Sequence, residues 1–307
     1  MTTLPRHPFG RTGFSITPLG FGSAEVGFLN TERDAAGRMM CWLLDQGVNL
    51  IDTAAGYAGA EEVIGEQVSH RRGDFVLVSK CGHKVAGVEG SPFSPQVVTR
   101  TVDRTLRNCR TDVLDVMLLH SCDLKTLRQG DALAALVKAR DAGKVRHVGY
   151  SGDNDAAAHA ATLPDVAVIE TSVNVVDQAN IDGVLPACVG NDIGVLAKRP
   201  IANAAWKDLD QQPGFYKNYA KEYTDRLRKM DVSPASVGFD GPWPELALRF
   251  TLSQPGVTCA IIGTSRIENA QANLGYARKG PLPPTVVEKL RAAFRAADPT
   301  GAWAGQT

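Results

Sequence analysis

The chain has 307 residues, of which 44% are hydrophobic and 21% are charged. This composition is typical of a globular protein with enough apolar side chains for one large core, and α/β barrels of about 250 residues commonly form one domain. The 33 basic and 33 acidic residues balance, and no run of like charge stands out. We therefore expect neither a nucleic-acid partner nor a membrane surface as a partner.

The ends and the cysteines of the chain indicate a compartment. The first residues lack the charged start and apolar stretch of a secretory signal, and no apolar run approaches the roughly 20 residues that span a bilayer. The six cysteines are scattered, without a C-x-x-C pair. This pattern predicts reduced thiols in a cytoplasmic protein, and it indicates neither a zinc site nor a disulfide framework.

The N-terminal part begins with a predicted β-hairpin and continues with a predicted helix. The segment His7–Phe14 has the pattern of a small hairpin around a glycine turn, which could close the bottom of a barrel. Thr31 is a candidate helix N-cap, and Gly47 is a candidate helix end. Four apolar residues between them fall at helical spacing on one face, namely Ala36, Met39, Met40 and Leu43.

Short apolar runs alternate with helical patterns along the rest of the chain, which predicts βα units and a parallel sheet. The expected strands are Pro18–Gly22, Val48–Ile51, Phe75–Ser79, Val113–Leu119, Val145–Tyr150, Val166–Glu170, Gly194–Lys198 and Thr258–Ile262. Further helices are expected at Pro95–Asn108, Thr126–Ala142, Asp177–Val189, Pro244–Ser253 and Pro284–Ala296.

Eight strands without a break in composition favour one closed (β/α)8 TIM barrel, with the N-terminal β-hairpin, as a single domain over residues 1–307. The gap before the eighth strand is unusually long and includes Trp206–Asp240. Such loops are commonly lids or binding loops. We expect this loop, with Trp206 and Phe215, and Phe21 to shape the substrate end of a pocket.

Four polar residues lie where predicted strands end, which is the face on which this fold keeps its active site. Asp52 follows the second strand, with Tyr57 five residues later, and Lys80 and His120 end the third and fourth strands. A lysine ammonium would lower the pKa of a neighbouring tyrosine, and an aspartate would hold the lysine. Singly, each residue has an ordinary structural explanation, but together they predict proton transfer to or from an oxygen.

The motifs around these residues identify a family. Gly47-Val48-Asn49-Leu50-Ile51-Asp52-Thr53-Ala54-Ala55-Gly56-Tyr57 closely resembles the aldo-keto reductase signature. Val78-Ser79-Lys80 and Asp115-Val116-Met117-Leu118-Leu119-His120 resemble the family's lysine and histidine strands. The resemblance implies reversible hydride transfer between a nicotinamide cofactor and a carbonyl or alcohol. It assigns Tyr57 as general acid or base, Lys80 and Asp52 as its tuning pair, and His120 as the residue that orients the substrate.

The resemblance also implies where the cofactor binds, without a Rossmann domain. Ser151 matches a contact of the nicotinamide carboxamide, although the usual neighbouring Asn is Gly152. Glu170 stands in place of a carboxamide-binding Gln, and Lys198 in place of an aromatic residue that stacks on the ring. Because Glu170 and Lys198 end adjacent strands, we hypothesise an ion pair between them. The alternative turns Lys198 outward, to the long loop or to a phosphate.

The segment after the eighth strand is the expected phosphate site, because this fold binds phosphates there at a helix N-terminus. Backbone amides of Gly263, Thr264 and Ser265 could hold a phosphate, and Arg266 could pair with a 2′-phosphate, which favours NADP(H) over NAD(H). Asn273 resembles the adenine contact. The remaining expected cofactor contacts are Arg199, Ile201 and Asn269.

Three other residues near the expected site have ordinary explanations. Cys81 and Cys122 read as small buried thiols, and His83 as a solvated loop residue. Nothing in the set requires a metal.

Two further functions stay open, besides a barrel with unrelated chemistry. One is an aldose or other alcohol dehydrogenase, for which an unpaired Lys198 would favour hydride acceptance. The other is a cofactor-binding regulatory protein with little turnover, although such a protein would not need the proton relay. A barrel with unrelated chemistry would leave Tyr57 dispensable. The sequence leaves open the small-molecule substrate, the direction of reaction and the oligomeric state.

Overall fold

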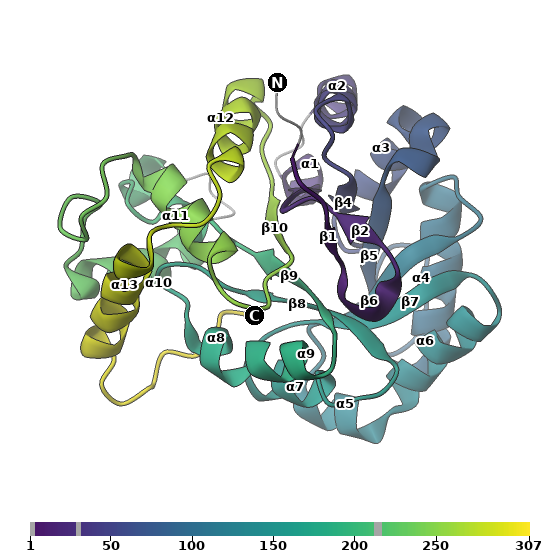
Figure 1. Cartoon of the computed structure of the whole chain (residues 1–307). Helices are drawn as coiled ribbons and strands as arrows, with labels where there is room; N and C mark the ends of the chain where they lie inside the picture. The colour runs from purple at the N-terminus through teal and green to yellow at the C-terminus, as the bar shows by residue number, and fades with distance from the viewer. Residues whose placement is uncertain (1–3, 29–31, 212–216) are drawn as a thin grey trace.

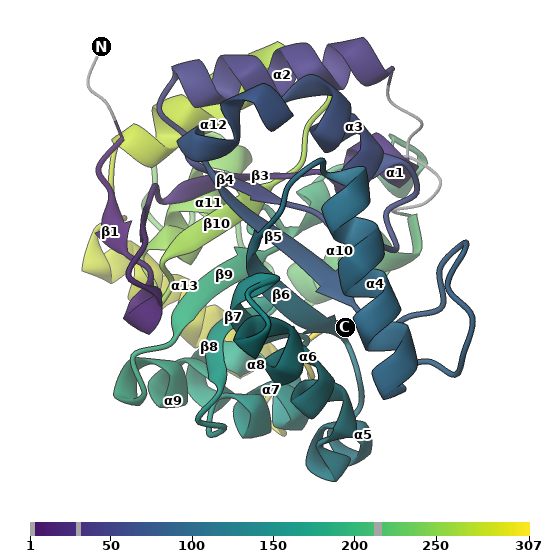
Figure 2. The same cartoon turned by 90° about the vertical axis from the view of Figure 1, so that its right-hand side faces the viewer.

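The computed structural model describes residues 4–28, 32–211 and 217–307. Eight parallel strands close into a barrel in the order β10-β3-β4-β5-β6-β7-β8-β9, and helices surround it (Figures 1 and 2). The barrel strands are β3 (Leu19–Gly22), β4 (Leu50–Asp52), β5 (Val76–Cys81), β6 (Leu114–His120), β7 (Val145–Ser151), β8 (Val166–Ser172), β9 (Gly194–Lys198) and β10 (Cys259–Ile262). The predicted (β/α)8 barrel is confirmed, with all eight strands close to their expected positions.

The α-helices form the outer layer. They are α1 (Ala24–Phe28), α2 (Arg33–Asp45), α3 (Ala60–Gln67), α4 (Pro95–Asn108), α5 (Leu124–Gln129), α6 (Asp131–Asp141), α7 (Asn154–Ala160), α8 (Ala179–Gly183), α9 (Leu185–Gly190), α10 (Lys217–Met230), α11 (Trp243–Leu252), α12 (Ile267–Arg278) and α13 (Pro284–Ala297). Short 3-10 helices are η1 (Gly10–Thr12), η2 (Ser69–Asp74), η3 (Ala202–Ala204) and η4 (Leu209–Gln211).

Two helices predicted as continuous are divided. The segment 126–142 is split into α5 and α6 at Gly130, whose φ of 81° is a left-handed conformation that ends a helix. The segment 177–189 is split into α8 and α9 at Val184, and a proline in the first turn of α9 cannot donate to the preceding turn.

The helix predicted before the second strand is present as α2. It buries Ala36, Met39, Met40 and Leu43 on one face, as the spacing predicted. Its candidate cap, Thr31, lies outside the described residues.

The long connection between β9 and β10 is largely helical. It contains α10 and α11 and two 3-10 helices, so the expected long loop is an excursion with helices of its own. No helix in the described ranges is long and apolar enough to cross a membrane.

The N-terminal hairpin closes the bottom of the barrel, as predicted. Strand β1 (His7–Pro8) pairs antiparallel with β2 (Ser15–Ile16). Phe9 between them is fully buried and packs in the apolar cluster that fills the barrel, together with Leu50, Val78 and Leu196. The bottom of the barrel interior is therefore occupied by apolar side chains, and the predicted site residues gather at the opposite end.

Candidate active site

The four predicted catalytic residues come together at the carboxyl ends of neighbouring strands. Lys80 donates to both carboxylate oxygens of Asp52 at 2.6 and 2.7 Å, and to the backbone oxygen of Thr53 at 3.0 Å. Its Nζ lies 5.1 Å from the centre of the Tyr57 ring. The rings of Tyr57 and His120 meet edge to face, with centroids 6.0 Å apart.

A second carboxylate shares Lys80. Glu170, from β8, has a carboxylate oxygen 3.2 Å from Lys80 Nζ, and both side chains are almost completely buried. The hypothesised pair between Glu170 and Lys198 is therefore wrong. Lys198 instead lies 2.7 Å from Asp153, a partner that the sequence analysis did not predict.

The register of the strands explains this partner exchange. Glu170 lies opposite Leu196 on β9, whereas Lys198 lies opposite Ser172, two residues nearer the mouth of the barrel. At that level Lys198 meets Asp153, which follows β7, while Glu170 lies deeper, at the level of Lys80.

Burial dominates the electrostatics of Tyr57. Lys80 lowers the pKa of the phenol, as predicted, but burial raises it more, and Asp52 and Glu170 also raise it. The result is a pKa of about 12, so the expectation of a lowered value is wrong. Burial and the neighbouring Glu170 likewise raise the pKa of Asp52, because two carboxylates share one ammonium.

His120 is held neutral. Burial lowers its pKa well below the ordinary value for histidine, and the positive charges of Lys80, Lys198 and Arg199 lower it further. A neutral imidazole can both donate and accept a hydrogen bond. Such a ring beside Tyr57 can orient an oxygen without carrying charge.

The flanking cysteines are buried thiols, as expected. Cys81 and Cys122 are each 2% exposed. Burial raises the pKa of Cys122 to about 12, so its thiolate is not populated near neutrality. His83 is exposed as expected, but its ring also lies 5.0 Å from that of His120, a contact that the sequence analysis did not predict.

The expected cofactor residues lie along half of the barrel mouth, from β7 to α12. Ser151 and Glu170 are buried at adjacent strand ends, in register with each other. Arg199 follows β9 and donates to Ser172, and Ile201 precedes η3. The turn Gly263–Ser265 leads into α12, on which Asn273 is buried and Asn269 exposed.

Polar atoms without protein partners fit a bound cofactor at this mouth. Among the described residues, the hydroxyls of Ser23 and Thr53 and one carboxylate oxygen of Glu170 are buried without a hydrogen bond, although that oxygen is near Lys80. Buried polar groups normally have hydrogen-bond partners. The Glu170 carboxylate could accept from a carboxamide NH2, and Arg266 is 72% exposed and only loosely paired with Glu268 at 3.7 Å.

Of the aromatic residues expected around the substrate, Phe21 is placed differently. Phe21 is 3% exposed and packs beside Leu43 and Val48 of the outer layer, so its predicted role at the pocket is wrong. The rings of Trp206 and Trp243 stack in parallel with centroids 5.7 Å apart. Phe215 lies outside the described residues.

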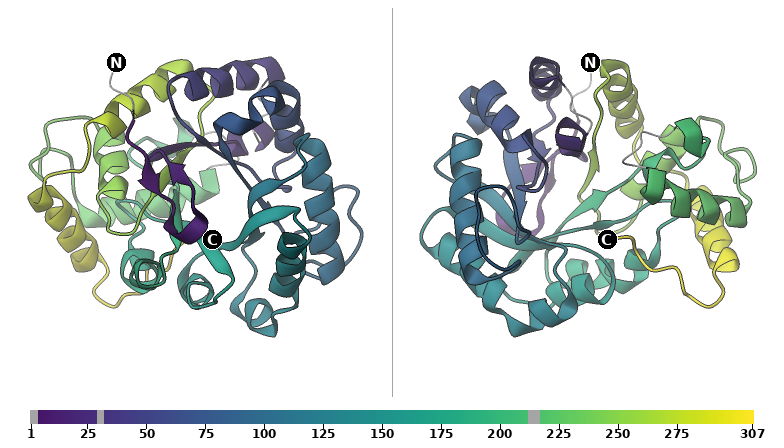
Figure 3. Two further views of the ribbon diagram at one scale, coloured as in Figure 1. Left: turned by 45° about the vertical axis from the view of Figure 1, so that its right-hand side comes forward. Right: turned by 180° about the vertical axis from the view of Figure 1, so that it is seen from behind.

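The C-terminal segment reaches the same mouth, which the sequence analysis missed. It leaves α13 and ends beside the barrel strands (Figures 1 and 3). Gln306 accepts from Ser172 at 3.0 Å and from Arg199, and Thr307 donates to Asp153 at 3.1 Å. Asp153 thereby links this segment to Lys198. No local pattern in the sequence signals a contact across 154 positions.

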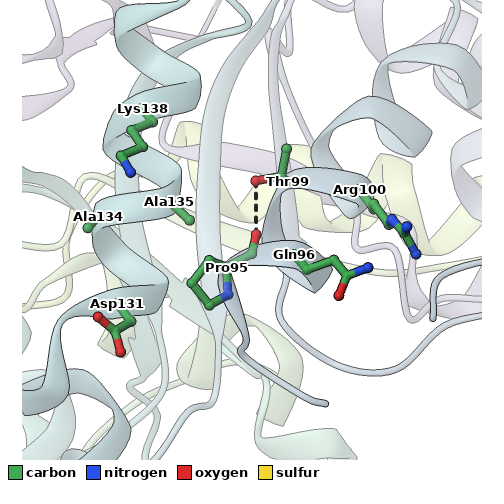
Figure 4. A pocket seen from close by; sticks show the side chains of 8 residues that line it. All are labelled: Pro95, Gln96, Thr99, Arg100, Asp131, Ala134, Ala135 and Lys138. Carbon is green, nitrogen blue, oxygen red and sulfur yellow. Dashed lines mark hydrogen bonds between the residues drawn. The ribbon is translucent and has the colours of Figure 1, made fainter. Parts of the chain in front are cut away.

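A separate hollow of about 430 Å³ lies on the outside of the barrel, between α4 and α6 (Figure 4). Its lining includes Gln96 and Arg100 from one helix and Asp131 and Lys138 from the other. None of the predicted site residues lines it, so the chemistry belongs to the mouth and not to this hollow.

The comparison with known families settles what kind of barrel this is. Residues 18–295 match the model of the aldo/keto reductase family. The chain belongs to the aldo/keto reductase family. This aldo/keto reductase is therefore an oxidoreductase of the class that uses nicotinamide cofactors, as its resemblance implied.

Similar proteins span the same length. An uncharacterized oxidoreductase of Bacillus subtilis is 25% identical over 301 residues, covering 93% of this chain and 95% of the relative. The L-galactose dehydrogenase of Arabidopsis thaliana is 23% identical, covering 89% of this chain and 88% of the relative. A solved aldo-keto reductase of Bacillus halodurans, in its holo form, has a similar fold with a TM-score of 0.79 at 23% identity, covering 94% and 96%.

Proposed function

We propose that this protein reduces aldehydes or ketones to alcohols, with Tyr57 as the proton donor and NADP(H) as the preferred cofactor. The observation that carries the proposal is the cluster of half-buried Tyr57 and His120 around buried Lys80, in which the pKa of the phenol is raised to about 12. A phenol with that pKa stays protonated near neutrality, which is the form that reduction requires.

Each residue of the cluster has a separate role in reduction. A bound nicotinamide supplies the hydride, and in the reverse direction it accepts one. The Tyr57 hydroxyl donates its proton to the substrate oxygen, and neutral His120 holds that oxygen by a hydrogen bond. Lys80, anchored by Asp52 and Glu170, stabilises the tyrosinate left after the proton has moved.

The proposed cofactor contacts are residues at the same mouth of the barrel. Ser151 and Glu170 would hold the carboxamide, and Lys198, Arg199 and Ile201 would border the nicotinamide and pyrophosphate. The turn Gly263–Ser265 and Arg266 would hold the phosphates. The remaining proposed contacts are Asn269 and Asn273, at the adenosine end. Exposed Arg266 favours NADP(H), because its side chain makes only the 3.7 Å ion pair with Glu268 among the described residues and can pair with a 2′-phosphate.

A sugar dehydrogenase is the second candidate, since the Arabidopsis relative is named as one. That alternative drew on an unpaired Lys198, and Lys198 is paired with Asp153. The raised pKa of Tyr57 also opposes its use as a base. A regulatory protein with little turnover is less well supported, because the complete cluster would serve no purpose in it. We propose a cytoplasmic location and one domain over residues 1–307.

Spectrophotometry of NADPH and NADH oxidation, with a panel of aldehydes and sugars, tests the proposal. Tyr57→Phe should lose at least a hundredfold in kcat while its affinity for cofactor, measured by fluorescence titration, is unchanged. Arg266→Ala should raise KM for NADPH and leave KM for NADH unchanged. Turnover of alcohols alone would favour the dehydrogenase, and cofactor binding without turnover in either direction would favour the regulatory protein.

A further inference from the structure

The loop after β5 brings a second histidine to the site. The ring of His83 lies edge to face against the ring of His120, with centroids 5.0 Å apart, and against Phe93 at 5.2 Å. His120 in turn faces Tyr57. The rings of Tyr57, His120 and His83 therefore form a continuous row from the expected point of proton transfer to the rim of the mouth.

The local backbone holds His83 in this place. Gly82 has a φ of 115°, which favours glycine, and its carbonyl accepts from the backbone N–H of Phe93 at 2.7 Å. A Cβ on Gly82 would come within 2.2 Å of the Phe93 ring, so that ring packs directly on the glycine. Phe93 itself has a φ of 59°, a conformation that non-glycine residues rarely adopt. The loop is thus pinned on both sides of His83.

His83 offers a hydrogen-bond acceptor to the mouth. One ring nitrogen of His83 has a hydrogen bond with the backbone of His120. This hydrogen bond raises the pKa of His83, so the ring nitrogen donates it to the carbonyl oxygen. Burial outweighs this and lowers the pKa, which favours the neutral ring. In a neutral imidazole the other nitrogen is an acceptor, and no described residue donates a hydrogen bond to it.

We propose that His83 accepts a hydrogen bond from a hydroxyl group on the substrate, and that the site therefore selects hydroxyaldehydes or hydroxyketones over simple carbonyl compounds. This inference rests on the proposed carbonyl reduction. In this proposal the carbonyl oxygen binds between Tyr57 and His120, and a hydroxyl on the adjacent carbon is directed to His83, whose ring adjoins that of His120. An alkyl group at this position would remove water from the His83 acceptor without forming a hydrogen bond to it.

The test compares two aldehydes that differ by one hydroxyl, lactaldehyde and propanal, in wild type and variants. The ratio of their kcat/KM values should fall about tenfold in His83→Leu, which is the effect of one hydrogen bond. His83→Gln retains an acceptor and should keep most of the selectivity. His70→Leu is the matched control, because His70 is exposed on η2, which precedes β5 at the opposite end of the strand.

The outcomes separate the inference from the proposed function. An unchanged ratio in His83→Leu, with both aldehydes still reduced, would overturn the role of His83 and leave carbonyl reduction intact. Wild-type protein that reduces neither aldehyde nor any other carbonyl compound would overturn both. Equal losses of kcat for the two aldehydes would mean that His83 only supports His120 and would also overturn the inference.

Discussion

Lys80 is the residue on which the local electrostatics depend, because one fully buried ammonium serves two carboxylates and a phenol. Its pKa is raised by Asp52, Glu170 and Tyr57, despite the opposing effect of burial. The two carboxylates offset much of its positive charge. Together with the burial of Tyr57, they keep the ammonium from bringing the pKa of Tyr57 below the ordinary value. This arrangement favours a phenol that gives a proton over one that takes it.

The pH dependence of the two directions should differ for this reason. Reduction requires protonated Tyr57, and a pKa of about 12 means that this form is lost only as the pH rises toward that value. We expect kcat/KM for reduction to be level between about pH 6 and 9, and that for oxidation to rise about tenfold per pH unit. A decline of reduction around neutrality, measured with a saturating cofactor, would contradict this assignment.

Glu170→Gln should change the pH dependence of both reduction and oxidation. Removal of the carboxylate takes away one cause of the raised pKa of Tyr57 and leaves Lys80 with a single counter-charge. We expect oxidation at fixed pH to become severalfold faster, and the alkaline decline of reduction to begin at lower pH. Glu66→Gln, on the partly exposed surface of α3, is the control and should leave both profiles unchanged.

At the scale of elements, the C-terminal segment ties the end of the chain to the mouth of the barrel. Trp303 lies under the cations of Arg226 and Lys229 and meets Phe294 edge to face, and Arg226 also binds the carbonyl of Ala304. Gly305 exchanges two hydrogen bonds with Asn154. These contacts hold the segment over β7, β8 and β9.

Gly305→Ala should loosen this segment. A Cβ at that position would come 2.6 Å from Asn180 and 2.9 Å from Asp153, which leaves no room for it. We expect a loss of about 1–3 kcal/mol in the free energy of unfolding, and weaker cofactor binding because Asp153 also positions Lys198. Gly275→Ala on α12 meets no atom within 4 Å, so its stability and cofactor affinity should be retained. Equal cofactor affinities in the two variants would refute the link to the mouth.

At the scale of the whole molecule, the barrel separates stability from chemistry. Apolar side chains fill the barrel interior and its bottom, while the charged residues of the candidate site lie at the carboxyl ends of the strands. Phe9 belongs to the bottom: it is fully buried, and its ring lies so close to Gly194 that a Cβ there would come within 2.3 Å. The hairpin is therefore part of the core rather than an appendage.

Phe9→Ala should cost about 3–5 kcal/mol in the free energy of unfolding, because it leaves a cavity where a ring was packed. Its KM and kcat at a temperature where it remains folded should match those of wild type, since Phe9 is at the opposite end from Tyr57. Denaturant unfolding and steady-state kinetics measure the two quantities. A large fall in kcat with unchanged stability would show that the bottom and the mouth are coupled.

The sequence by itself determined the barrel and the positions of Asp52, Tyr57, Lys80 and His120. Apolar runs mark buried strands, and parallel strands bring their carboxyl ends to one face, so residues at those ends had to meet. Breaks inside helices were less predictable, although Gly130 in the segment 126–142 and a proline in the segment 177–189 were local signals of such breaks.

Only the tertiary structure decided how the charges are paired. The partners of Glu170 and Lys198 depend on strand register and on Asp153, and the anchoring of the last residues is a contact across 154 positions. The pKa of Tyr57 likewise depended on how deeply the ring is buried, which opposes the effect of Lys80. Sequence patterns record which side chains can interact, but depth and register determine which of them do, because electrostatic energies change steeply with distance and with exclusion of water.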